Sequence, residues 1–481
     1  MDNKFLLQGG GEKDSLIVCR NSQGLEVRAT PLRMTRHLVV FEVYNPYSIL
    51  QLSEVLNEFQ IIVNERLIYS GRAVVSNLVN TGILLVCEAS LDEAWLDVDL
   101  FSPINQRDKL LAEVGEFLRE QQKVNIVRPD FKVVVADMQT MLNDLRRWME
   151  QVELGVRSQP SANRNLLERE IIHELQNPIL PSLIPLFERF EETCGTIEED
   201  LRPAHGTYVK RQLHPVVLCA PFFYRTFRKP LGYAGDYEMV NMMLRDPLEG
   251  GSMFAKMLNL FFLNTPPVVA HRNRITYLVQ KLKDEIQRVS TTEGRPCRIF
   301  NLGCGPAREI QELIETSDVS NQAKFTLLDF NDETLQHTGK LLEALRVKHQ
   351  RTTSVTMIKK SVHQILKDAG KPLPDMMPGS YDLVYCAGLF DYLSDRICKK
   401  LMSIFYDLVA PGGLLVATNV DASNPSRNWM EYVVEWHLVY RDRNVFELLK
   451  PEGATPENAA LKSDVTGVNI FIEVRKPRPN A

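Results

Sequence analysis

The sequence predicts a multidomain chain of 481 residues, with a small N-terminal β-barrel, a helical middle region and a C-terminal α/β domain. Short strand-like runs without intervening helices occupy residues 1–100. Apolar residues at helical spacing dominate residues 101–200, the predicted helical connector, and a mixed region follows at 201–290, the predicted cap. From 291 to 481, buried strand-like runs alternate with helical segments, which is typical of a parallel α/β sheet.

The N-terminal region carries the strand pattern of a small barrel. Its strand-like runs cover residues 15–19, 38–44, 60–64, 67–75 and 81–86, and turn residues separate them. Closing such short strands on themselves removes exposed sheet edges. We therefore expect a barrel over residues 1–100.

The helical connector shows apolar residues at helical spacing in segments 110–118 and 134–145. A small polar break at Ser158–Asn163 is a candidate linker. A further amphipathic stretch begins near Leu166, and its prolines are expected to limit its regularity; these are Pro178, Pro181 and Pro185. The helices are predicted to bridge the barrel to the C-terminal α/β domain or to pair with a second subunit in a homodimer.

Composition excludes several classes of function. The net charge of −5 gives no general attraction to nucleic acid or to an anionic membrane. No basic-then-apolar signal opens the sequence and no apolar run approaches the length of a membrane span, so we expect a cytoplasmic protein without stable membrane insertion. The 8 cysteines include no C-x-x-C pair, so neither a metal site nor a disulfide framework is expected.

The stretch 298–309 predicts a buried strand, a tight turn and the start of a helix. Gly303 and Gly305 can adopt positive φ and allow a ligand to approach the backbone. Pro306 suits a first helical turn, and Ala307 stands where a dinucleotide-binding fingerprint has its third glycine. By itself this turn fits a structural role as well as a nucleotide-binding one.

Three later segments extend the pattern. A second buried strand ends in Asp329, whose carboxylate can accept hydrogen bonds from ribose hydroxyls. A strand at 381–386 leads into the segment 387–393, and a Pro-Gly-Gly turn precedes the strand that ends at Asn419. Together these segments resemble the class I S-adenosylmethionine-dependent methyltransferases. The alternative, a nicotinamide-binding domain, fits the strand at 381–386 and the Pro-Gly-Gly turn less well.

The resemblance covers about residues 291–481 and implies a Rossmann-like seven-stranded sheet. It also implies that the glycine turn holds the methionine portion of the cofactor, that Asp329 holds the ribose, and that Gly388–Asp391 lie near the transferred methyl group. The cofactor-binding residues it implies are Asn301, Gly303, Gly305, Arg274, Asp329, Phe330, Ser361, Gly388, Leu389 and Asp391.

The cap region contains a run of basic residues without an acid, between Val209 and Pro230. The basic residues are Lys210, Arg211, Arg225, Arg228 and Lys229. The segment 229–238 then favours a shaped loop. One interpretation is a surface loop; the other is a cap whose cations and aromatic residues line the acceptor site. After Pro266, a predicted helix places His271 and Arg274 on one face, toward the cofactor carboxylate or the acceptor.

Motifs across residues 165–481 resemble the bacterial extracellular-factor 3-hydroxypalmitic acid methyl ester biosynthesis proteins. They include K-P-L-G-Y-A-G-D-Y-E, A-H-R-N-R, N-L-G-C-G-P-A-R-E, C-A-G-L-F-D-Y-L and W-H-L-V-Y-R-D. The resemblance implies esterification of a fatty-acid carboxylate to make a quorum-sensing signal. The candidate catalytic residues are Tyr224, Arg225, Tyr233, Asp236 and His437. His437 falls in a predicted helix, 429–441, whose aromatic residues either pack in the core or line the acceptor pocket.

Residues 71–85 resemble the PilZ domain, a barrel that binds cyclic di-GMP in many bacteria. The basic residues available for phosphates, Arg28, Arg33 and Arg36, depart from the usual spacing, and Val79 replaces the serine of the turn at 77–82. The resemblance implies a possible cyclic di-GMP site. The alternative is a degenerate barrel used for packing or dimerisation.

The identity of the methyl acceptor stays open between two chemistries. A carboxylate is already ionised and needs only cations or hydrogen-bond donors to orient it, whereas an amine needs acids and a base. Acids suited to an amine are present at Asp236, Glu238, Glu431 and Glu435. The uninterrupted basic run favours a carboxylate on a small molecule. A regulatory protein that binds nucleotide without turnover is a third hypothesis, and nucleic-acid methylation is not expected.

Overall fold

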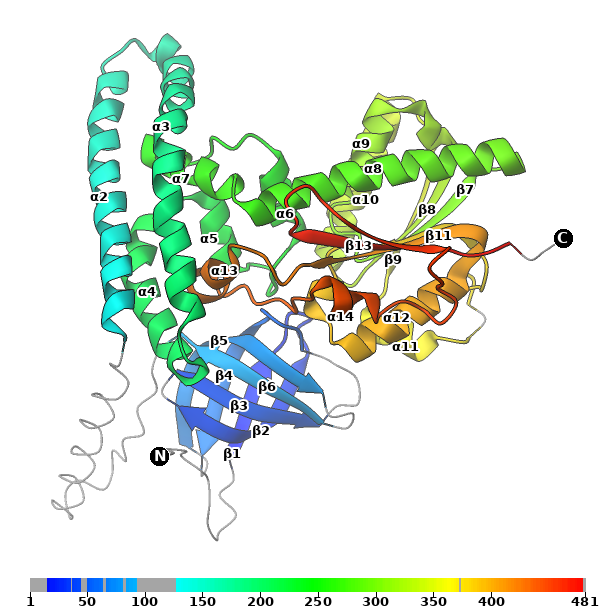
Figure 1. Ribbon diagram of the computed structural model, residues 1–481, viewed down its shortest axis with the longest axis horizontal. Coiled ribbons are helices and arrows are strands. Elements are labelled where there is room, and N and C mark those ends of the chain that lie inside the picture. Colours follow the sequence, from blue (N-terminus) through cyan, green and yellow to red (C-terminus); the bar gives the residue numbers. More distant parts are fainter. Residues whose placement is uncertain are drawn as a thin grey trace, which may run out of the picture. The chain divides into compact units, whose positions relative to one another are not determined.

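The computed structural model describes residues 15–35, 37–44, 50–63, 66–80, 84–92, 127–371 and 373–478 (Figure 1). The chain divides into two compact units. Unit 1 comprises Met1–Ala234, Asp246–Phe262 and Pro425–His437, and unit 2 comprises Gly235–Arg245, Leu263–Asn424 and Leu438–Ala481. Each unit is therefore assembled from separate stretches of sequence.

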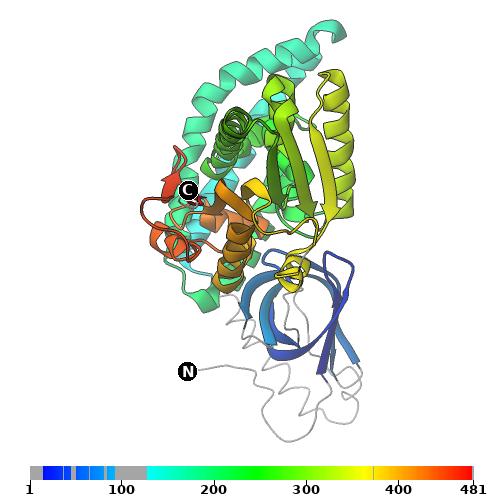
Figure 2. The ribbon, with the colours of Figure 1, turned by 90° about the vertical axis from the view of Figure 1, so that its right-hand side faces the viewer.

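Unit 1 begins with a closed antiparallel barrel, as predicted (Figure 2). Its strands are β1 (Ser15–Arg20), β2 (Glu26–Thr35), β3 (Leu38–Tyr44), β4 (Val55–Val63), β5 (Arg66–Asn80) and β6 (Leu84–Leu91), in the order β1-β2-β3-β6-β5-β4. The sequence pattern missed β2. Only Val27 and Ala29 of its first half face the core, charged residues alternate with them, and the pairing shifts register after Pro31.

Part of the cyclic di-GMP hypothesis lies outside the described residues. Arg28 and Arg33 are exposed on β2, where Arg28 pairs with Glu26 at 2.8 Å. Arg36 and the end of the expected turn, residues 81–83, lie outside the described residues. The helix predicted over 110–118 also lies outside them. Nucleotide binding by the barrel and homodimer formation therefore stay predictions.

Two long helices follow, α2 (Pro129–Arg157) and α3 (Ser161–Gly195), and they pack along each other (Figure 1). The predicted linker near Ser158 is only the short turn of this helical hairpin. The prolines were predicted to limit the regularity of this stretch, but α3 runs continuously through Pro178, Pro181 and Pro185. All three prolines face solvent, where water can bond to the carbonyl groups that they leave unpaired.

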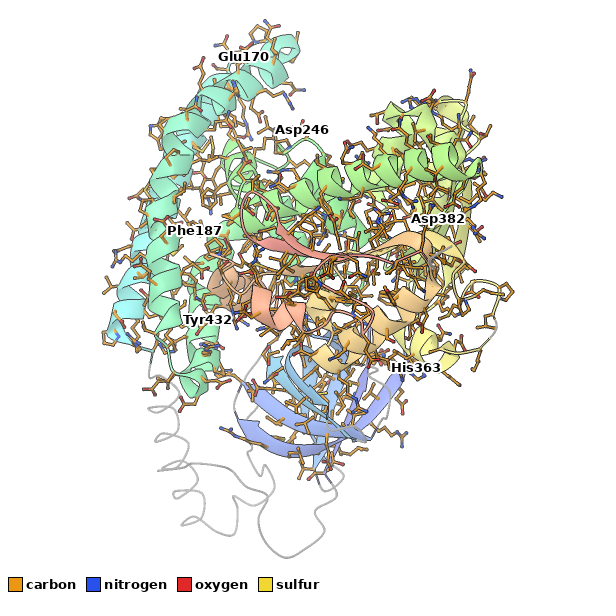
Figure 3. All side chains as sticks on the ribbon, turned by 45° about the vertical axis from the view of Figure 1, so that its right-hand side comes forward. Glu170, Phe187, Asp246, His363, Asp382 and Tyr432 are labelled. Atoms are coloured by element: carbon orange, nitrogen blue, oxygen red, sulfur yellow. The ribbon has the colours of Figure 1, made fainter. Side chains whose placement is uncertain are left out.

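An aromatic cluster joins the remaining helices of unit 1 to α3. These helices are α4 (Arg202–Val217), α5 (Pro221–Arg228), α7 (Met253–Leu263) and α13 (Arg427–Val434). The Trp429 ring lies 4.6 Å from that of Phe187, 5.5 Å from that of Phe223 and 5.8 Å from that of Phe262. Figure 3 labels two residues of this part of unit 1, Phe187 of α3 and Tyr432 of α13. Trp429 is therefore a core residue of unit 1.

Helix α13 corrects the prediction of a helix over 429–441. It ends at Val434, and Glu435 adopts a left-handed conformation with φ 53°. Residues 435–440 are not helical, so Tyr432, Trp436 and Tyr440 do not form the expected helical stripe. The cause is tertiary, because the Glu435 side chain is buried against cations from distant elements.

Glu435 is the centre of this ion cluster. Its carboxylate accepts hydrogen bonds from Lys210 of α4 and from Arg72 of β5, the latter at 2.9 Å. Arg72 also pairs with Asp92 at 2.8 Å, and Lys229 donates to the Val434 carbonyl at 2.9 Å. Burial alone would raise the pKa of Glu435, but the charges of Lys210, Arg72 and Lys229 lower it well below its ordinary value. The cluster therefore ties the barrel to α4 and α13.

Unit 2 is built on a seven-stranded sheet, as predicted. The strands are β7 (Cys297–Leu302), β8 (Ala323–Asp329), β9 (Ser354–Lys359), β10 (Tyr381–Cys386), β11 (Val409–Val420), β12 (Ala459–Ser463) and β13 (Asn469–Arg475), in the order β12-β13-β11-β10-β7-β8-β9. The five neighbouring strands β11, β10, β7, β8 and β9 run parallel to one another. Strand β13 pairs antiparallel with both β11 and β12. The C-terminal antiparallel strand predicted near 464–474 is β13.

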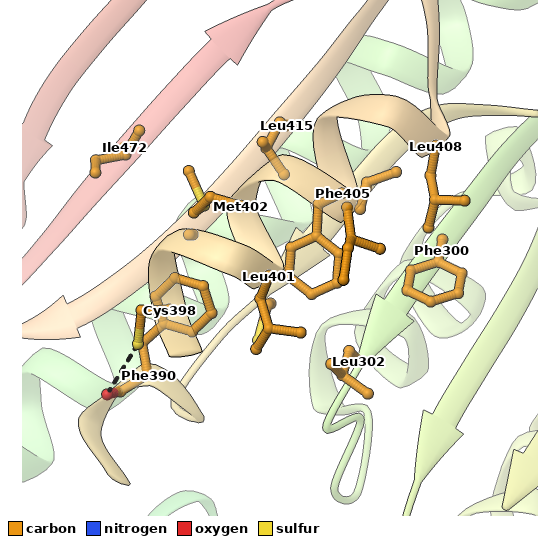
Figure 4. Packing of buried hydrophobic residues seen from close by; sticks show 14 of the residues in the cluster. Phe300, Leu302, Phe390, Cys398, Leu401, Met402, Phe405, Leu408, Leu415 and Ile472 are labelled. Atoms are coloured by element: carbon orange, nitrogen blue, oxygen red, sulfur yellow. Dashed lines mark hydrogen bonds between the residues drawn. The ribbon is translucent and has the colours of Figure 1, made fainter. Parts of the chain in front are cut away.

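Helices cover both faces of the sheet. On one face, α8 (Pro266–Glu293), α9 (Arg308–Thr316) and α10 (Asp332–Lys348) pack on alternate strand residues such as Ile299. On the other, α11 (Val362–Asp368), α12 (Asp395–Leu408) and α14 (Arg443–Glu447) pack on residues such as Phe300 (Figure 4). The strand order reverses between β7 and β10, and α/β sheets bind ligands beyond the carboxyl ends of strands at such a point.

The ion cluster yields a stability prediction. Glu435→Gln leaves the half-buried cations Arg72 and Lys210 without their carboxylate, so the free energy of unfolding of unit 1 should fall by about 3 kcal/mol. Tryptophan fluorescence during urea unfolding measures this fall, because all four tryptophans of the sequence belong to the ranges of unit 1 and unit 2 has none. The matched control is Glu58→Gln, whose pair with Arg20 is solvent-exposed and contributes less than about 1 kcal/mol. Equal effects of the two changes would contradict the prediction.

Candidate functional site

The glycine turn after β7 is held on both sides. Gly303 and Gly305 have φ of 72° and 50°, in the left-handed region that favours glycine. The Gly303 amide donates to the Leu328 carbonyl of β8 at 2.8 Å, and the Thr338 hydroxyl of α10 donates to the Gly305 carbonyl at 2.7 Å. Pro306 precedes α9 instead of entering its first turn, which corrects that expectation. The turn thus presents a fixed backbone at the carboxyl edge of the sheet.

Asp329 ends β8 beside this turn and is 6% exposed. Its carboxylate accepts from the Gly305 amide at 3.1 Å and from the Asn331 amide at 3.0 Å. Burial raises the pKa of Asp329, and these amide bonds oppose the rise. Phe330, the next residue, is half-buried. The acid is therefore oriented by the same backbone that forms the glycine turn.

Arg274 projects from α8 onto the loop that follows β10. Its guanidinium lies directly against Gly388: a Cβ at that residue would be 2.9 Å from Nη2. The same nitrogen donates to Nδ1 of His271 at 2.8 Å, as the predicted shared face requires. Burial and the charge of Arg274 hold the pKa of His271 well below its usual value, so the imidazole is neutral and accepts this bond.

The loop Gly388–Asp391 is fastened to β11. The Gly388 amide donates to the Thr418 hydroxyl at 3.1 Å, and the buried Asp391 carboxylate accepts from the Val420 amide at 2.7 Å. Burial raises the pKa of Asp391, while the charge of Arg274 lowers it. Leu389 approaches the glycine turn, since a Cβ at Gly303 would lie 3.6 Å from it. The ends of β7, β10 and β11 therefore meet around one cation.

Helix α6 (Tyr237–Leu244) crosses from α10 to α8 near this edge. The Tyr237 ring stacks on His337 of α10 at 4.4 Å, and its hydroxyl donates to Glu333 at 2.8 Å. At the other end, Arg272 of α8 donates to the Met243 carbonyl at 3.3 Å. Asp236, a candidate catalytic residue, is buried and its carboxylate caps α6 by accepting from the Met239 amide.

The other candidate residues have different surroundings. Ser361 caps α11 and forms a capping box with Gln364. Tyr224 is 48% exposed on α5, and Arg225, Tyr233 and His437 are half-buried. The backbone of His437 is held by the Ser53 hydroxyl of the barrel, and burial lowers the pKa of His437. Tyr224, Arg225, Tyr233 and His437 belong to unit 1, whereas Asp236 and the predicted cofactor-binding residues belong to unit 2.

Sequence reasoning missed a polar pair behind the glycine turn. The Tyr385 hydroxyl of β10 donates to the Glu309 carboxylate of α9 at 2.6 Å, and both side chains are buried. Asn301 of β7 is the register partner of Tyr385 on the neighbouring strand. Glu309 was part of the quoted motif and received no role, although an acid in the first turn of a helix after a glycine turn is a usable signal.

The close approach at Gly388 yields a binding prediction. In Gly388→Ala the new Cβ meets the Arg274 guanidinium at a positive φ of 86°, so that cation must move. We expect the affinity for S-adenosylhomocysteine to fall about tenfold or more, the effect of losing one charged hydrogen bond. Titration calorimetry measures it. Gly379→Ala is the control, because Gly379 has φ of 66° with no atom near its Cβ position. Unchanged affinity in Gly388→Ala would argue against a cofactor role for Arg274.

Metal and membrane features are not evident in the part of the chain that the structure describes. Within the described ranges, no group of three or more His, Cys, Asp or Glu residues is arranged to hold a metal ion. Nor does any helix of those ranges combine the length and apolar character that crossing a bilayer requires.

Comparisons with known proteins address the same region. Residues 294–464 match a family model described as a methyltransferase domain. A possible exported protein from Bordetella parapertussis is 18% identical, with 53% of this chain and 86% of that chain covered and a TM-score of 0.40. The magnesium protoporphyrin IX methyltransferase of Synechocystis PCC 6803 is 10% identical, with 56% and 99% covered and a TM-score of 0.35.

No curated protein matches the sequence. The family match nevertheless falls on the seven-stranded sheet and includes its glycine turn and the residues at its carboxyl edge. The matched residues thus carry a methyltransferase domain on this seven-stranded sheet.

Proposed function

We propose that this methyltransferase esterifies the carboxylate of a small molecule, most readily a fatty or hydroxy-fatty acid. One observation carries the choice of acceptor. The four acids that could bind an amine acceptor are all engaged within the protein: Asp236 caps α6, Glu238 pairs with Arg245, Glu431 pairs with Arg427, and Glu435 pairs with Arg72 and Lys210. An amine acceptor would have to break one of these pairs.

The residues at the carboxyl edge of the sheet fit the cofactor. Asp329 would accept from the ribose hydroxyls, and the backbone of Gly303 and Gly305 would allow the methionine portion to approach. Arg274 would hold the cofactor carboxylate from α8. S-adenosylmethionine supplies a methyl carbon that its sulfonium has already activated.

The acceptor side needs alignment more than acid–base chemistry. A carboxylate is ionised at neutral pH, so no residue has to remove a proton before its oxygen bonds to the methyl carbon and the bond from that carbon to sulfur breaks. The protein then has to orient the two groups in line and exclude water. From the sequence resemblance we assign the orienting role to Arg225, Tyr224 and Tyr233, and we keep Asp236 and His437 as further candidates for the acceptor side.

The basic run contributes fewer cations than its sequence suggested. Lys210 and Lys229 are bound to Glu435 and to the Val434 carbonyl. Burial lowers the pKa of Lys229 to about 7, which weakens it further as a cation. The other cations proposed for an acceptor carboxylate are Arg225, which is half-buried, and Arg211 and Arg228, which are exposed.

The alternatives make different predictions about the same domain. A small-molecule N-methyltransferase would use the acids named above, and a regulatory protein would bind the cofactor without turnover. Cyclic di-GMP binding by the barrel and a role in quorum sensing are further proposals, which rest on the sequence resemblances. We also propose a homodimer, from the predicted helices, and a cytoplasmic location, from the composition.

Turnover tests the acceptor. Purified protein with S-adenosylmethionine is offered long-chain 3-hydroxy acids and small amines, and the products are identified by mass. We expect methyl esters from the acids, because the carboxylate needs no base. Methylated amines would overturn the choice of acceptor, and measured cofactor binding without any product would favour the regulatory alternative.

A second prediction concerns Asp329. Asp329→Asn removes the negative charge that would accept two ribose hydroxyls, so affinity for S-adenosylhomocysteine should fall about 10- to 100-fold. Equilibrium binding measures the loss. Asp332→Asn is the matched control, because that acid lies three residues further on and its side chain is 60% exposed. Similar affinities for both variants would contradict the ribose role of Asp329.

A further inference from the structure

Arg441 has no role in the function proposed above, although it belongs to the motif W-H-L-V-Y-R-D. Its side chain is 1% exposed, and a guanidinium buried to this degree has to find acceptors for its N–H groups inside the protein. Arg441 lies in unit 2, where its backbone amide donates to the Val420 carbonyl of β11 at 3.3 Å. The side chain therefore starts from a fixed position beside the sheet.

Two of the acceptors are carbonyl groups of the loop that follows β10. Nη1 of Arg441 donates to the Phe390 carbonyl at 2.9 Å, and Nη2 donates to the Leu393 carbonyl at 2.6 Å. These two carbonyls bracket the short 3₁₀ turn Phe390–Tyr392. A buried carbonyl without a donor is costly, so the guanidinium favours this one position of the turn. Arg441 therefore clamps the second half of the loop.

The other acceptors fix the guanidinium itself. Nη1 also donates to the side-chain oxygen of Asn419 on β11 at 2.6 Å, and Nε donates to Asp395, the first residue of α12, at 2.8 Å. The buried Asn419 side chain donates in turn to the Val439 carbonyl at 3.0 Å, and the Val439 amide donates to the Asp391 carbonyl at 2.7 Å. Strand, loop and the segment that carries Arg441 thus hold one another in one buried network.

The two halves of the loop have separate anchors. In the first half, the Gly388 amide donates to the Thr418 hydroxyl, and the Gly388 backbone lies against the Arg274 guanidinium. In the second half, the carbonyls on either side of the turn Phe390–Tyr392 depend on Arg441. We therefore expect the loss of the Arg441 clamp to release the turn while Gly388 stays in place.

The clamped turn borders the place where the proposed function puts the cofactor. A Cβ at Gly303 would lie 3.6 Å from Leu389, which immediately precedes the turn, so the loop lies beside the glycine turn. Tyr392 ends the 3₁₀ turn, and a Cβ at Gly235 would lie 3.0 Å from its hydroxyl oxygen. Methyl transfer needs the acceptor in line with the methyl group, and a misplacement of about 1 Å can cost about 100-fold in rate. A fixed turn at this place therefore serves alignment.

We propose that Arg441 is a positioning residue for methyl transfer, which acts by clamping the turn Phe390–Tyr392 onto β11. The inference rests on the proposed function, because it requires that the cofactor bind beside this loop. The Arg441 side chain is buried, so it acts through the loop and not on the reacting atoms. The planar guanidinium is needed as well as the charge, since the single nitrogen of a lysine cannot reproduce the bonds from Nε, Nη1 and Nη2.

The test compares Arg441→Lys with Arg443→Lys in the full chain, because Arg443 is an exposed arginine of the same segment. Hydrogen exchange read by mass spectrometry follows the loop without any need for turnover. Amide exchange in the peptide 388–394 should quicken about tenfold or more in Arg441→Lys alone, the effect of losing one charged hydrogen bond. The peptides of β10 and β11 should keep their protection.

Turnover and cofactor binding then separate positioning from folding. In Arg441→Lys, kcat for an acid that the unaltered protein esterifies should fall about 10- to 100-fold. The affinity for S-adenosylhomocysteine, measured by titration calorimetry, should change less than about threefold, because Gly388 keeps its own anchors. If Arg441→Lys does not fold, Asn419→Ser replaces it: this change removes the oxygen that orients the guanidinium and should open the same peptide by a smaller factor.

The other outcomes count against the inference or against the acceptor. Unchanged exchange in the loop would overturn the clamp, and selective exchange with an unchanged kcat would overturn the positioning role. Faster exchange throughout unit 2 with an equal loss of cofactor affinity would make Arg441 a residue of the fold alone. Selective exchange in the loop, in a protein that binds S-adenosylhomocysteine but esterifies no acid, would uphold the clamp and overturn only the proposed acceptor.

Discussion

The reversal of strand order between β7 and β10 is the constraint on which the site depends. The chain leaves β7 toward β8 and β9 on one side and later returns to place β10 and β11 on the other. The connecting segments diverge at this point, so the carboxyl ends of two adjacent strands are left uncovered by their own connections. The glycine turn follows β7, Asp329 ends β8, and the loop Gly388–Asp391 comes after β10. All three therefore lie at the carboxyl ends of neighbouring strands.

A single cation organises the polar groups that meet there. The Arg274 guanidinium can lie on the backbone at Gly388 only because that residue has no Cβ, and the positive φ of Gly388 turns the loop toward it. Burying a cation is expensive unless anions accompany it. Asp391 and Glu309 provide this compensation, and each is fixed by a hydrogen bond, from Val420 and from Tyr385. The arrangement holds charges of both signs before any ligand binds.

Local sequence patterns predicted the parts of the protein whose cause is local. The strand at 297–302, its glycine turn and Asp329 were found because apolar runs, positive-φ glycines and strand-end acids are short-range signals. The end of α13 at Val434 was not predicted, because Glu435 leaves the helix to pair with cations that are distant in the sequence. The pairing of Glu309 with Tyr385 has the same explanation, since 76 residues separate the two partners.

The barrel orders the chain at the two places where it leaves unit 1 for the sheet. Within unit 1, the Val55 amide donates to the Gly232 carbonyl at 2.7 Å, and Ser53 binds the backbone of His437. Asp236, which caps α6, follows Gly232 by four residues, and Val439, whose amide donates to the Asp391 carbonyl, follows His437 by two. Gly232 and His437 are thus fixed within unit 1 just before the chain passes into unit 2.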